Sequence, residues 1–325
     1  MYTPPFTITS KIVNLIAEIC SELERYKLQN EKQSLHLRKV NKMKTIHGSL
    51  AIEGNSLSEN QVTALIEGKT VVAPLKEVQE VRNAIKTYEN FMNFDPFNYK
   101  SLLKAHAIMA LGLVDKPGHF RKSGVCVASK DGIAHIAPPH DRVPILISDL
   151  FEWLKFSDVH ALIKSCVFHY EFEFIHPFED GNGRMGRLWQ SRILAEWNEV
   201  FAYLPIENMI WKRQFEYYKA IQLSTDNTDS SFFIEFMLET ILESIKDAKN
   251  SDNVKDNVKD NVKLSEKQKL IISAIKKNPF ITQSELSNLV GINIININRN
   301  MKRLQENGII KRIGSDKSGH WEICE

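Results

Sequence analysis

The stretch HPFEDGNGRMGR, from His176 to Arg187, gathers one histidine, two acids, three glycines and two arginines within twelve residues. Apolar residues follow it at helical spacing, so we expect Gly181-Asn182-Gly183 to open a helix. Backbone N–H groups at a helix start have no partner inside the helix, and the helix dipole favours negative charge there. The stretch therefore predicts an anion-binding site at a helix N-terminus. The apolar positions behind this prediction are Leu188, Trp189, Ile193 and Leu194.

The residue types in this stretch suit the transfer of a phosphoryl or nucleotidyl group. The glycines let a phosphate approach the backbone closely. Arg184 and Arg187 share a helix face and can clamp phosphate oxygens in a two-pronged way. Asp180 can hold Mg²⁺ against the same phosphates, and His176 can take a proton from an attacking hydroxyl near neutral pH. Each residue alone is more often structural, but together they indicate group transfer by positioning and charge neutralisation.

Length and composition bound the class of protein. The chain has 325 residues, of which 43% are hydrophobic and 25% charged, which is typical of a soluble globular protein with room for one large and one small domain. The formal net charge is +2; residues 264–325 hold ten Lys and Arg against six Asp and Glu, or +4, which leaves −2 for residues 1–263. This modestly basic tail is the one hint of a charged partner.

Targeting and redox signals are weak. The four cysteines lie far apart and form no CxxC pair, so we expect neither a zinc site nor a disulfide framework. The N-terminus lacks the basic and apolar regions of a signal peptide, and no apolar run reaches the length of about eighteen residues that spans a membrane. We therefore expect a cytoplasmic protein without membrane contacts.

The pattern of apolar residues predicts a mostly helical main domain with one small hairpin. Helical periodicity recurs before residue 240, whereas strand-like alternation is clearest in VCVASKDGIAHI, residues 125–136, where Asp131-Gly132 could form the turn. Residues 252–263 repeat a polar tetrapeptide, DNVK, and mark a domain boundary as either a helical extension or a tether. The expected divisions are 1–100 (N-terminal helices), 101–246 (main core), 247–263 (linker) and 264–325 (small domain).

The last sixty or so residues resemble the winged helix-turn-helix family of DNA-binding domains. Capping-box patterns at Ser265 and Thr282 predict two helix starts, and Gly291 predicts a helix end. A third helical run and the hairpin-like GIIKRIGSDKSGHWEI complete the pattern. DNA and protein contacts are both open for such a domain, and the candidate DNA-binding residues on the third run are Arg299, Lys302 and Arg303.

The stretch from His176 to Arg187 resembles, at every defined position, the signature of the Fic family, HxFx(D/E)GNGRxxR. The resemblance covers roughly residues 1–240. It implies a helical fold and transfer of AMP from ATP, with Mg²⁺, to a Ser, Thr or Tyr hydroxyl of a protein, with release of pyrophosphate. His176 would be the general base, Asp180 the Mg²⁺ ligand and Phe178 a structural anchor. Nucleotide contacts would come from Gly181, Asn182, Gly183, Arg184, Met185, Gly186 and Arg187.

The hairpin gains a role from the same resemblance. Residues 125–136 look like the family's flap, which binds a target segment as an added β-strand and presents its hydroxyl. Val127 and Ala128 fall where the flap approaches the nucleotide, and Tyr217, in EYYKAI, falls near the base. Thr225 stands where a close relative's pattern has Asn, so that contact is not carried over. Family members of this layout are often homodimers, which the resemblance extends to this chain as an expectation.

A second stretch, SLAIEGN from Ser49 to Asn55, predicts a helix that ends at Gly54 with Glu53 in its last turn. A carboxylate there opposes the helix dipole, by about 0.3–1 kcal/mol, unless a cation lies nearby. The stretch resembles the Fic inhibitory motif, (S/T)xxxE(G/N), with Ser49, Glu53 and Gly54 in the required positions. In that family the glutamate pairs with the second arginine of the signature, here Arg187, and takes space that the γ-phosphate needs. The resemblance therefore implies an autoinhibited enzyme with an N-terminal inhibitory helix.

Other interpretations stay open beside an autoinhibited protein adenylyltransferase. The group transferred could be UMP, phosphate or phosphocholine, although Gly183 favours nucleotidyl transfer because the family's kinase-like branch carries a bulkier residue there. Glu53 could also orient a water that removes AMP, giving a bifunctional enzyme. The chain could instead be a transcription regulator with a nucleotide-sensing core, but sensing alone needs no base at His176. A metallohydrolase using His169 and His176 is disfavoured because there is no HExxH motif.

Overall fold

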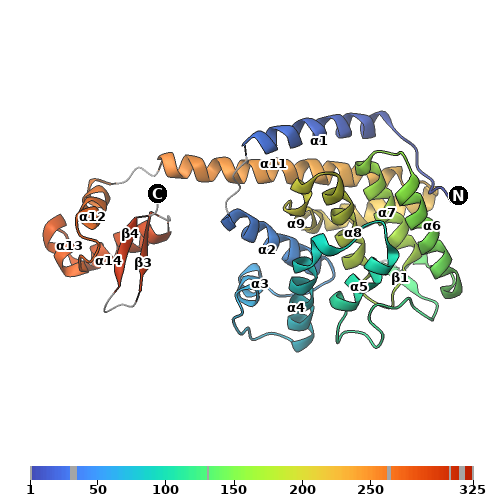
Figure 1. The fold of residues 1–325 in the computed structure, drawn as a ribbon, viewed down its shortest axis with the longest axis horizontal. Helices are drawn as coiled ribbons and strands as arrows, with labels where there is room; N and C mark the ends of the chain where they lie inside the picture. The colour runs from blue at the N-terminus through green and yellow to red at the C-terminus, as the bar shows by residue number, and fades with distance from the viewer. Residues whose placement is uncertain are drawn as a thin grey trace. The chain divides into compact units, whose positions relative to one another are not determined.

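The computed structural model describes residues 2–29, 35–129, 132–261, 265–306, 309–314 and 319–323. The chain divides into two compact units, Met1–Ser251 and Asp252–Glu325 (Figure 1). Each unit has its own hydrophobic core. Among the described residues, no helix combines the length and the apolar character needed to cross a bilayer. The two units are described separately below.

The first unit is a bundle of helices with one small hairpin, which confirms the predicted all-α Fic-like core. The hairpin pairs β1 (Cys126–Ser129) antiparallel with β2 (Gly132–Ile136), with Ser129 opposite Gly132; Asp131 of the expected turn lies outside the described residues. The helices are α1 (Ser10–Gln29), α2 (Leu35–Ile52), α3 (Glu59–Ile66), α4 (Leu75–Glu89), α5 (Tyr99–Met109), α6 (Val143–Phe156), α7 (Ala161–Ile175), α8 (Asn182–Trp197), α9 (Ile206–Lys212), α10 (Gln214–Asn227) and α11 (Ser231–Asn261), with short 3₁₀ turns at Phe91–Asn93, His140–Arg142 and Glu199–Ala202.

Helix α8 forms the centre of this unit and is buried on almost every side. Met185, Leu188 and Trp189 are each 0% exposed, and three arginines and the single glutamine of the same helix are buried beside them. A helix that is buried all round cannot show a narrow apolar stripe, because every face meets another helix. Helix α7 packs directly against α8, so the loop that joins them is held between two core elements.

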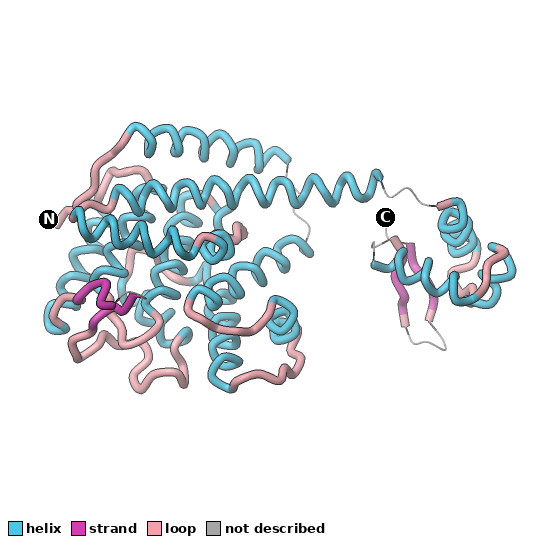
Figure 2. The backbone as a smooth tube through the Cα atoms, turned by 180° about the vertical axis from the view of Figure 1, so that it is seen from behind, coloured by secondary structure: helices cyan, strands magenta, loops and turns pink. Residues whose placement is uncertain are grey.

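Ion pairs join the first and last helices of this unit along their length. Helices α1 and α11 run side by side (Figures 1 and 2). Lys11 contacts Glu239 at 2.7 Å, and Lys246 contacts Glu18 at 2.7 Å. Residues 252–261 of the polar repeat are helical and continue α11, so the helical extension is the alternative that the structure supports for them.

The second unit confirms the predicted winged helix-turn-helix. Capping boxes begin α12 (Glu266–Lys277) and α13 (Gln283–Val290), because Ser265 and Thr282 exchange hydrogen bonds with Gln268 and Glu285. Gly291 ends α13 in a left-handed conformation with φ 69°. Helix α14 (Ile294–Glu306) precedes the antiparallel strands β3 (Ile310–Ile313) and β4 (His320–Ile323). The core of this unit is formed by Ile271, Ile275, Leu286, Ile297, Met301 and Leu304.

Candidate active site

The loop between α7 and α8 is fixed by an amide that folds back on it. His176 ends α7 in a left-handed conformation with φ 50°, which a residue with a side chain adopts only when its surroundings hold it there. The Asn182 side chain accepts from Phe178 N and donates to Phe178 O, each at 2.9 Å. Phe178 is 0% exposed, so it anchors the loop in the core as the resemblance implies. His176 itself is half-buried at the edge of the site.

A second histidine supports the same loop and was missed by sequence reasoning. The His106 ring stacks on Phe178 with ring centroids 3.7 Å apart. Its Nδ1 accepts from Gly118 N at 2.9 Å, so Nε2 carries the proton and donates to Asp180 O at 3.0 Å. Burial lowers the pKa of His106 to about 4, so this ring stays neutral and structural. An isolated histidine 70 residues upstream carries no sequence signal for this role.

A buried arginine ties the loop to both flanks of the flap. Arg121 is 2% exposed, and its Nε donates to His176 O at 2.8 Å. Its two terminal nitrogens donate to Ser123 O at 2.7 Å and to Pro138 O at 2.5 Å, just before β1 and just after β2. One guanidinium therefore positions the candidate base relative to the hairpin expected to hold the target.

The N-terminus of α8 is open toward the site. Gly181 is its N-cap with φ 85° and offers no side chain, and the first helical hydrogen bond is Met185 N to Gly181 O at 3.0 Å. The N–H groups of residues 182–184 thus precede the helical ladder and are the ones that can face an anion. A Cβ at Gly183 would collide with the Glu53 carboxylate and would lie 2.9 Å from Arg187 Nη1. Gly183 therefore leaves a cradle that, in this structure, the Glu53 carboxylate fills.

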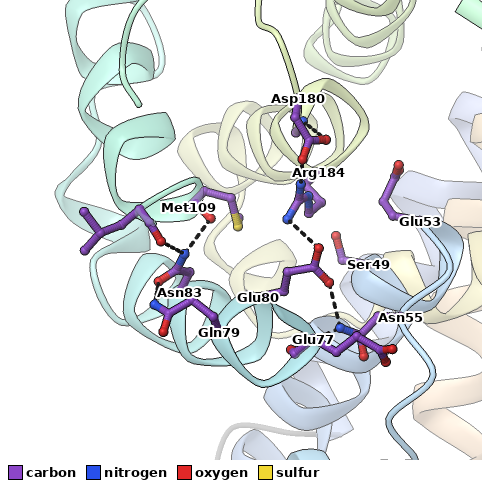
Figure 3. Close-up of polar contacts among 12 residues, drawn as sticks. Ser49, Glu53, Asn55, Glu77, Gln79, Glu80, Asn83, Met109, Asp180 and Arg184 are labelled. Carbon is purple, nitrogen blue, oxygen red and sulfur yellow. Dashed lines mark hydrogen bonds and ion pairs between the residues drawn. The ribbon is translucent and has the colours of Figure 1, made fainter. Parts of the chain in front are cut away.

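The first arginine of the signature is buried with unsatisfied donors. Arg184 is 3% exposed, and within the described part of the chain its Nε and Nη1 have no hydrogen-bond partner. Asp180 Oδ2 lies 3.2 Å from Nη2, and Glu80 Oε1 lies 3.9 Å from Nη1 (Figure 3). Buried donors without partners are costly, so this guanidinium fits an incoming anion such as a phosphate.

The second arginine is held by the end of α2. Arg187 is 1% exposed, and its Nη2 donates to Glu53 Oε1 at 2.7 Å and to Ser49 O at 2.9 Å. Burial disfavours the charge, but the Glu53 carboxylate raises the pKa of Arg187 above its ordinary value. The charged guanidinium also lies at the negative end of the α2 dipole, which offsets the cost of the Glu53 carboxylate there.

Backbone hydrogen bonds fix where Glu53 lies. Glu53 directly follows α2, and Gly54 adopts φ 88°. Asn55 N donates to Leu50 O at 3.2 Å and Gly54 N to Ala51 O at 3.1 Å, which is the pattern of a Schellman turn. Gln214 Nε2 from α10 donates to Ile52 O at 2.7 Å. The last carbonyls of α2 thus all accept hydrogen bonds, which hold the Glu53 backbone in place.

One carboxylate beside the start of α8, that of Asp180, could hold the expected Mg²⁺. Asp180 has a side chain 47% exposed, directly before the helix N-terminus. Among the described residues, no three His, Cys, Asp or Glu side chains converge as a metal cluster. Mg²⁺ commonly binds one or two carboxylates together with substrate phosphates, so the single carboxylate of Asp180 fits that mode.

Three residues that the resemblance places at the nucleotide are buried in this structure. Met185 is 0% exposed and its N–H is bonded within the helix, so it packs the core. A Cβ at Gly186 would meet Glu173 Oε1 and the His169 ring, each at 2.8 Å, so this glycine allows α7 and α8 to approach. Tyr217 is 1% exposed with its hydroxyl 3.1 Å from His169 Nε2, so its ring packs in the core, whereas the adjacent Tyr218 is 47% exposed.

Other expected residues are placed as follows. Val127 and Ala128 lie in β1 opposite His135 and Ile133, and their side chains are outside the described set. His169 is bonded on both ring nitrogens, to Gln190 and to Tyr217, and burial lowers its pKa to about 3. A metal-binding role for His169 therefore has no support.

The fold and this geometry define a helical domain that can hold an anion between a helix N-terminus and two buried arginines. The Fic/DOC family profile matches residues 96–194, and a winged helix-turn-helix DNA-binding profile matches residues 264–311. A crystal structure of a Fic family protein from Desulfovibrio desulfuricans is 39% identical and covers 99% of this chain and 98% of its own, with a TM-score of 0.78. The chain belongs to the Fic family.

Curated relatives match about half of the chain. A protein adenylyltransferase Fic from Culex quinquefasciatus is 31% identical over 194 residues, which is 56% of this chain and 36% of that protein. A probable protein adenylyltransferase from Aquifex aeolicus is 32% identical over 142 residues, 42% of this chain and 41% of that protein. The matched region thus spans 36% and 41% of these two relatives' own length.

Proposed function

We propose that this chain is an autoinhibited protein adenylyltransferase, which transfers AMP from ATP to a Ser, Thr or Tyr hydroxyl of a protein, itself included. The single observation that carries the proposal is the position of Glu53. Its carboxylate lies over Gly183 and bonds to Arg187, so a negative group already occupies the cradle where phosphates would bind. The similarity to protein adenylyltransferases supports the class of reaction, and the contact between Glu53 and Arg187 supports the restraint.

The roles of the residues follow from their positions. His176 takes the proton of the acceptor hydroxyl as its oxygen bonds to the α-phosphorus and the bond to pyrophosphate breaks. The N–H groups of residues 182–184 and the unpaired donors of Arg184 hold the phosphate oxygens. Asp180 would hold Mg²⁺, which would supply charge neutralisation for the phosphates. The flap at residues 125–136 holds the target as an added strand.

Glu53 restrains this reaction by competition for one place. An outer phosphate and the Glu53 carboxylate would both bind the Arg187 guanidinium, and two negative groups bound side by side repel each other. Release therefore requires that Glu53 leave Arg187, which either a substitution or a movement of α2 would achieve.

The test is AMP incorporation by the Glu53→Gly variant. With labelled ATP and Mg²⁺, this variant should modify itself more strongly than the unaltered chain, and mass spectrometry should report the mass of AMP on a hydroxyl residue. Glu53→Gly combined with His176→Ala should still bind ATP by calorimetry but transfer nothing. Equal AMP incorporation by the unaltered chain and by Glu53→Gly would overturn the proposed restraint. Stronger labelling from UTP than from ATP would show that the donor is UTP.

Two further activities remain distinct candidates. Removal of AMP by a water oriented on Glu53 would make the enzyme bifunctional, and it is assayed as AMP release from a pre-modified target. DNA binding by the second unit is favoured by the winged-helix profile and by α14, on which Arg299, Lys302 and Arg303 are exposed. Such a unit could make the chain a DNA-binding regulator that is also an enzyme.

A further inference from the structure

The turn that follows the inhibitory helix is held by helix α4, to which no role has been assigned so far (Figure 3). Glu77 accepts from Ser56 N at 2.6 Å and from Ser56 Oγ at 2.7 Å. The Asn55 side-chain amide donates to Glu77 O at 3.2 Å, and its Oδ1 accepts from Leu57 N at 3.1 Å. The segment immediately after Glu53 is therefore clamped by both the backbone and the side chains of α4.

Glu80, one turn further along α4, reaches both this turn and the anion site. Its Oε2 accepts from Asn55 Nδ2 at 2.8 Å, and its Oε1 lies 3.9 Å from Arg184 Nη1. The Glu80 side chain is 15% exposed and Arg184 is 4% exposed, so water screens neither contact well. One carboxylate thus touches the inhibitory turn with one oxygen and faces the first phosphate-binding arginine with the other.

Helix α4 is itself fixed to the core, so Glu80 does not depend on a nucleotide for its position. Asn83 is 4% exposed and donates to Met109 O at 3.1 Å and to Leu111 O at 2.8 Å, at the end of α5 (Figure 3). Gln79 donates to the Asn83 amide oxygen at 2.8 Å, and Val81 is 0% exposed. A rigid helix therefore presents Glu80.

We infer that Glu80 is a positioning residue with two separable effects on the proposed reaction. Through Asn55 it holds the Schellman turn, because Asn55 N closes that turn on Leu50 O, and so it aims Glu53 at Arg187. Through its other oxygen it orients the Arg184 guanidinium for phosphate. This inference rests on the proposed adenylyl transfer and adds a second contact that sets the strength of the restraint.

The experiment uses the full chain with ATP and Mg²⁺ and measures AMP self-incorporation and the KM for ATP. Asn55→Ala removes the turn contact and leaves Glu80 beside Arg184. It should raise basal incorporation by about tenfold, the factor expected when a hydrogen bond to a charged group is lost. Glu80→Gln keeps an acceptor for Asn55 but loses the charge that faces Arg184, so it should raise the KM for ATP without the rise in basal incorporation expected of Asn55→Ala. Glu80→Ala loses both contacts and should release the restraint as Asn55→Ala does.

The same substitutions in the Glu53→Gly background separate the two effects. In the Glu53→Gly background, Asn55→Ala should not change AMP incorporation, because no restraint is left. Glu80→Ala should raise the KM for ATP in that background while kcat changes little. A merely structural role would instead lower activity in both backgrounds. Arg82→Ala, exposed on the same helix, is the matched control and should behave as its parent in each assay.

The outcomes distinguish this inference from the proposed function. If Glu53→Gly transfers no AMP, adenylyl transfer itself is wrong. If Glu53→Gly is active but Asn55→Ala matches the unaltered chain, or if Asn55→Ala raises activity equally in both backgrounds, Glu80 and Asn55 do not aim Glu53.

Discussion

At the scale of single residues, burial raises the pKa of two carboxyl groups near Arg187. Burial raises the pKa of Glu173 to about 8 and that of Glu207 to about 7. In each case the charge of Arg187 works in the opposite direction without overcoming burial. A neutral Glu173 or Glu207 competes less for Arg187, which leaves Glu53 as its close partner at 2.7 Å.

Glu207 should make the stability of the protein pH-dependent. Its pKa is raised from the ordinary 4.5 to about 7, so its contribution is fully present below 4.5 and is lost as pH rises through 7. Glu207→Gln does not titrate and can still accept from Ser191 Oγ, which lies 2.9 Å from Glu207 Oε1. Relative to the unaltered chain, this variant should gain about 1–3 kcal/mol of unfolding free energy between pH 5 and pH 8.

Denaturant unfolding of both proteins at the two pH values measures this difference. Glu285→Gln is a control, since Glu285 lies in the other unit and the Thr282 backbone lowers its pKa. Parallel losses of stability in the unaltered chain and in Glu207→Gln would contradict the assignment.

At the scale of secondary-structure elements, the fold must bring α2 close to α8 so that Glu53 reaches Arg187. Helix α2 achieves this by packing backbone to backbone on α9. A Cβ at Gly48 would lie 2.6 Å from both Cα and N of Asn208, so no larger residue fits without moving a helix. The composition of the α2 surface does not reveal this approach, because it depends on the partner helix.

Gly48→Ala should therefore displace α2. Alanine favours a helix over glycine by about 1 kcal/mol. The overlap with the Asn208 backbone costs about 1–3 kcal/mol, and this cost outweighs the gain because backbone atoms cannot move aside as a side chain can. We expect a lower melting temperature together with higher AMP self-incorporation, since Glu53 moves with α2. Lys44→Ala on the same helix is the control. If Gly48→Ala lowers the melting temperature but leaves AMP incorporation unchanged, the packing of α2 on α9 does not determine how Glu53 restrains the reaction.

At the scale of the whole molecule, two separate hydrophobic cores imply two units that can be altered independently. The first core surrounds α8, and the second unites α12, α13 and α14 with the last hairpin. Exposed cations on α14 belong to the second unit and lie outside the machinery proposed for AMP transfer. Changes to them should therefore leave the chemistry of the first unit intact.

The double variant Arg299→Ala, Arg303→Ala tests this separation together with DNA binding. If the second unit binds duplex DNA, the variant should bind more weakly, and the slope of log K against log salt should become shallower by about 2. Fluorescence anisotropy on labelled duplexes over a salt series measures both. AMP transfer by Glu53→Gly should be unchanged by the pair. Unaltered DNA affinity would exclude the α14 face as the binding surface.

Local chemistry accounts for what could be predicted without a structure. Helix periods, the capping boxes at Ser265 and Thr282 and the helix stop at Gly291 depend on neighbours within a few residues, so they follow from short stretches. The start of α8, where we propose that an anion binds, is equally local, because its glycines and arginines lie close together in sequence. The winged helix and the helical core were predicted correctly for this reason.

Long-range contacts decided the rest, and no local rule anticipates them. Glu53 and Arg187 are 134 positions apart, and their pairing was expected from the family resemblance rather than from residue chemistry. Tyr217 and Tyr218 are indistinguishable in EYYKAI, yet only packing against His169 buries one and leaves the other exposed. Glu80 looks like any surface glutamate until α4 brings it to Asn55 and Arg184. Residue types thus specify which chemistry is available, whereas burial and the meeting of distant helices select which groups perform it, because the free energy of a charge depends on what surrounds it.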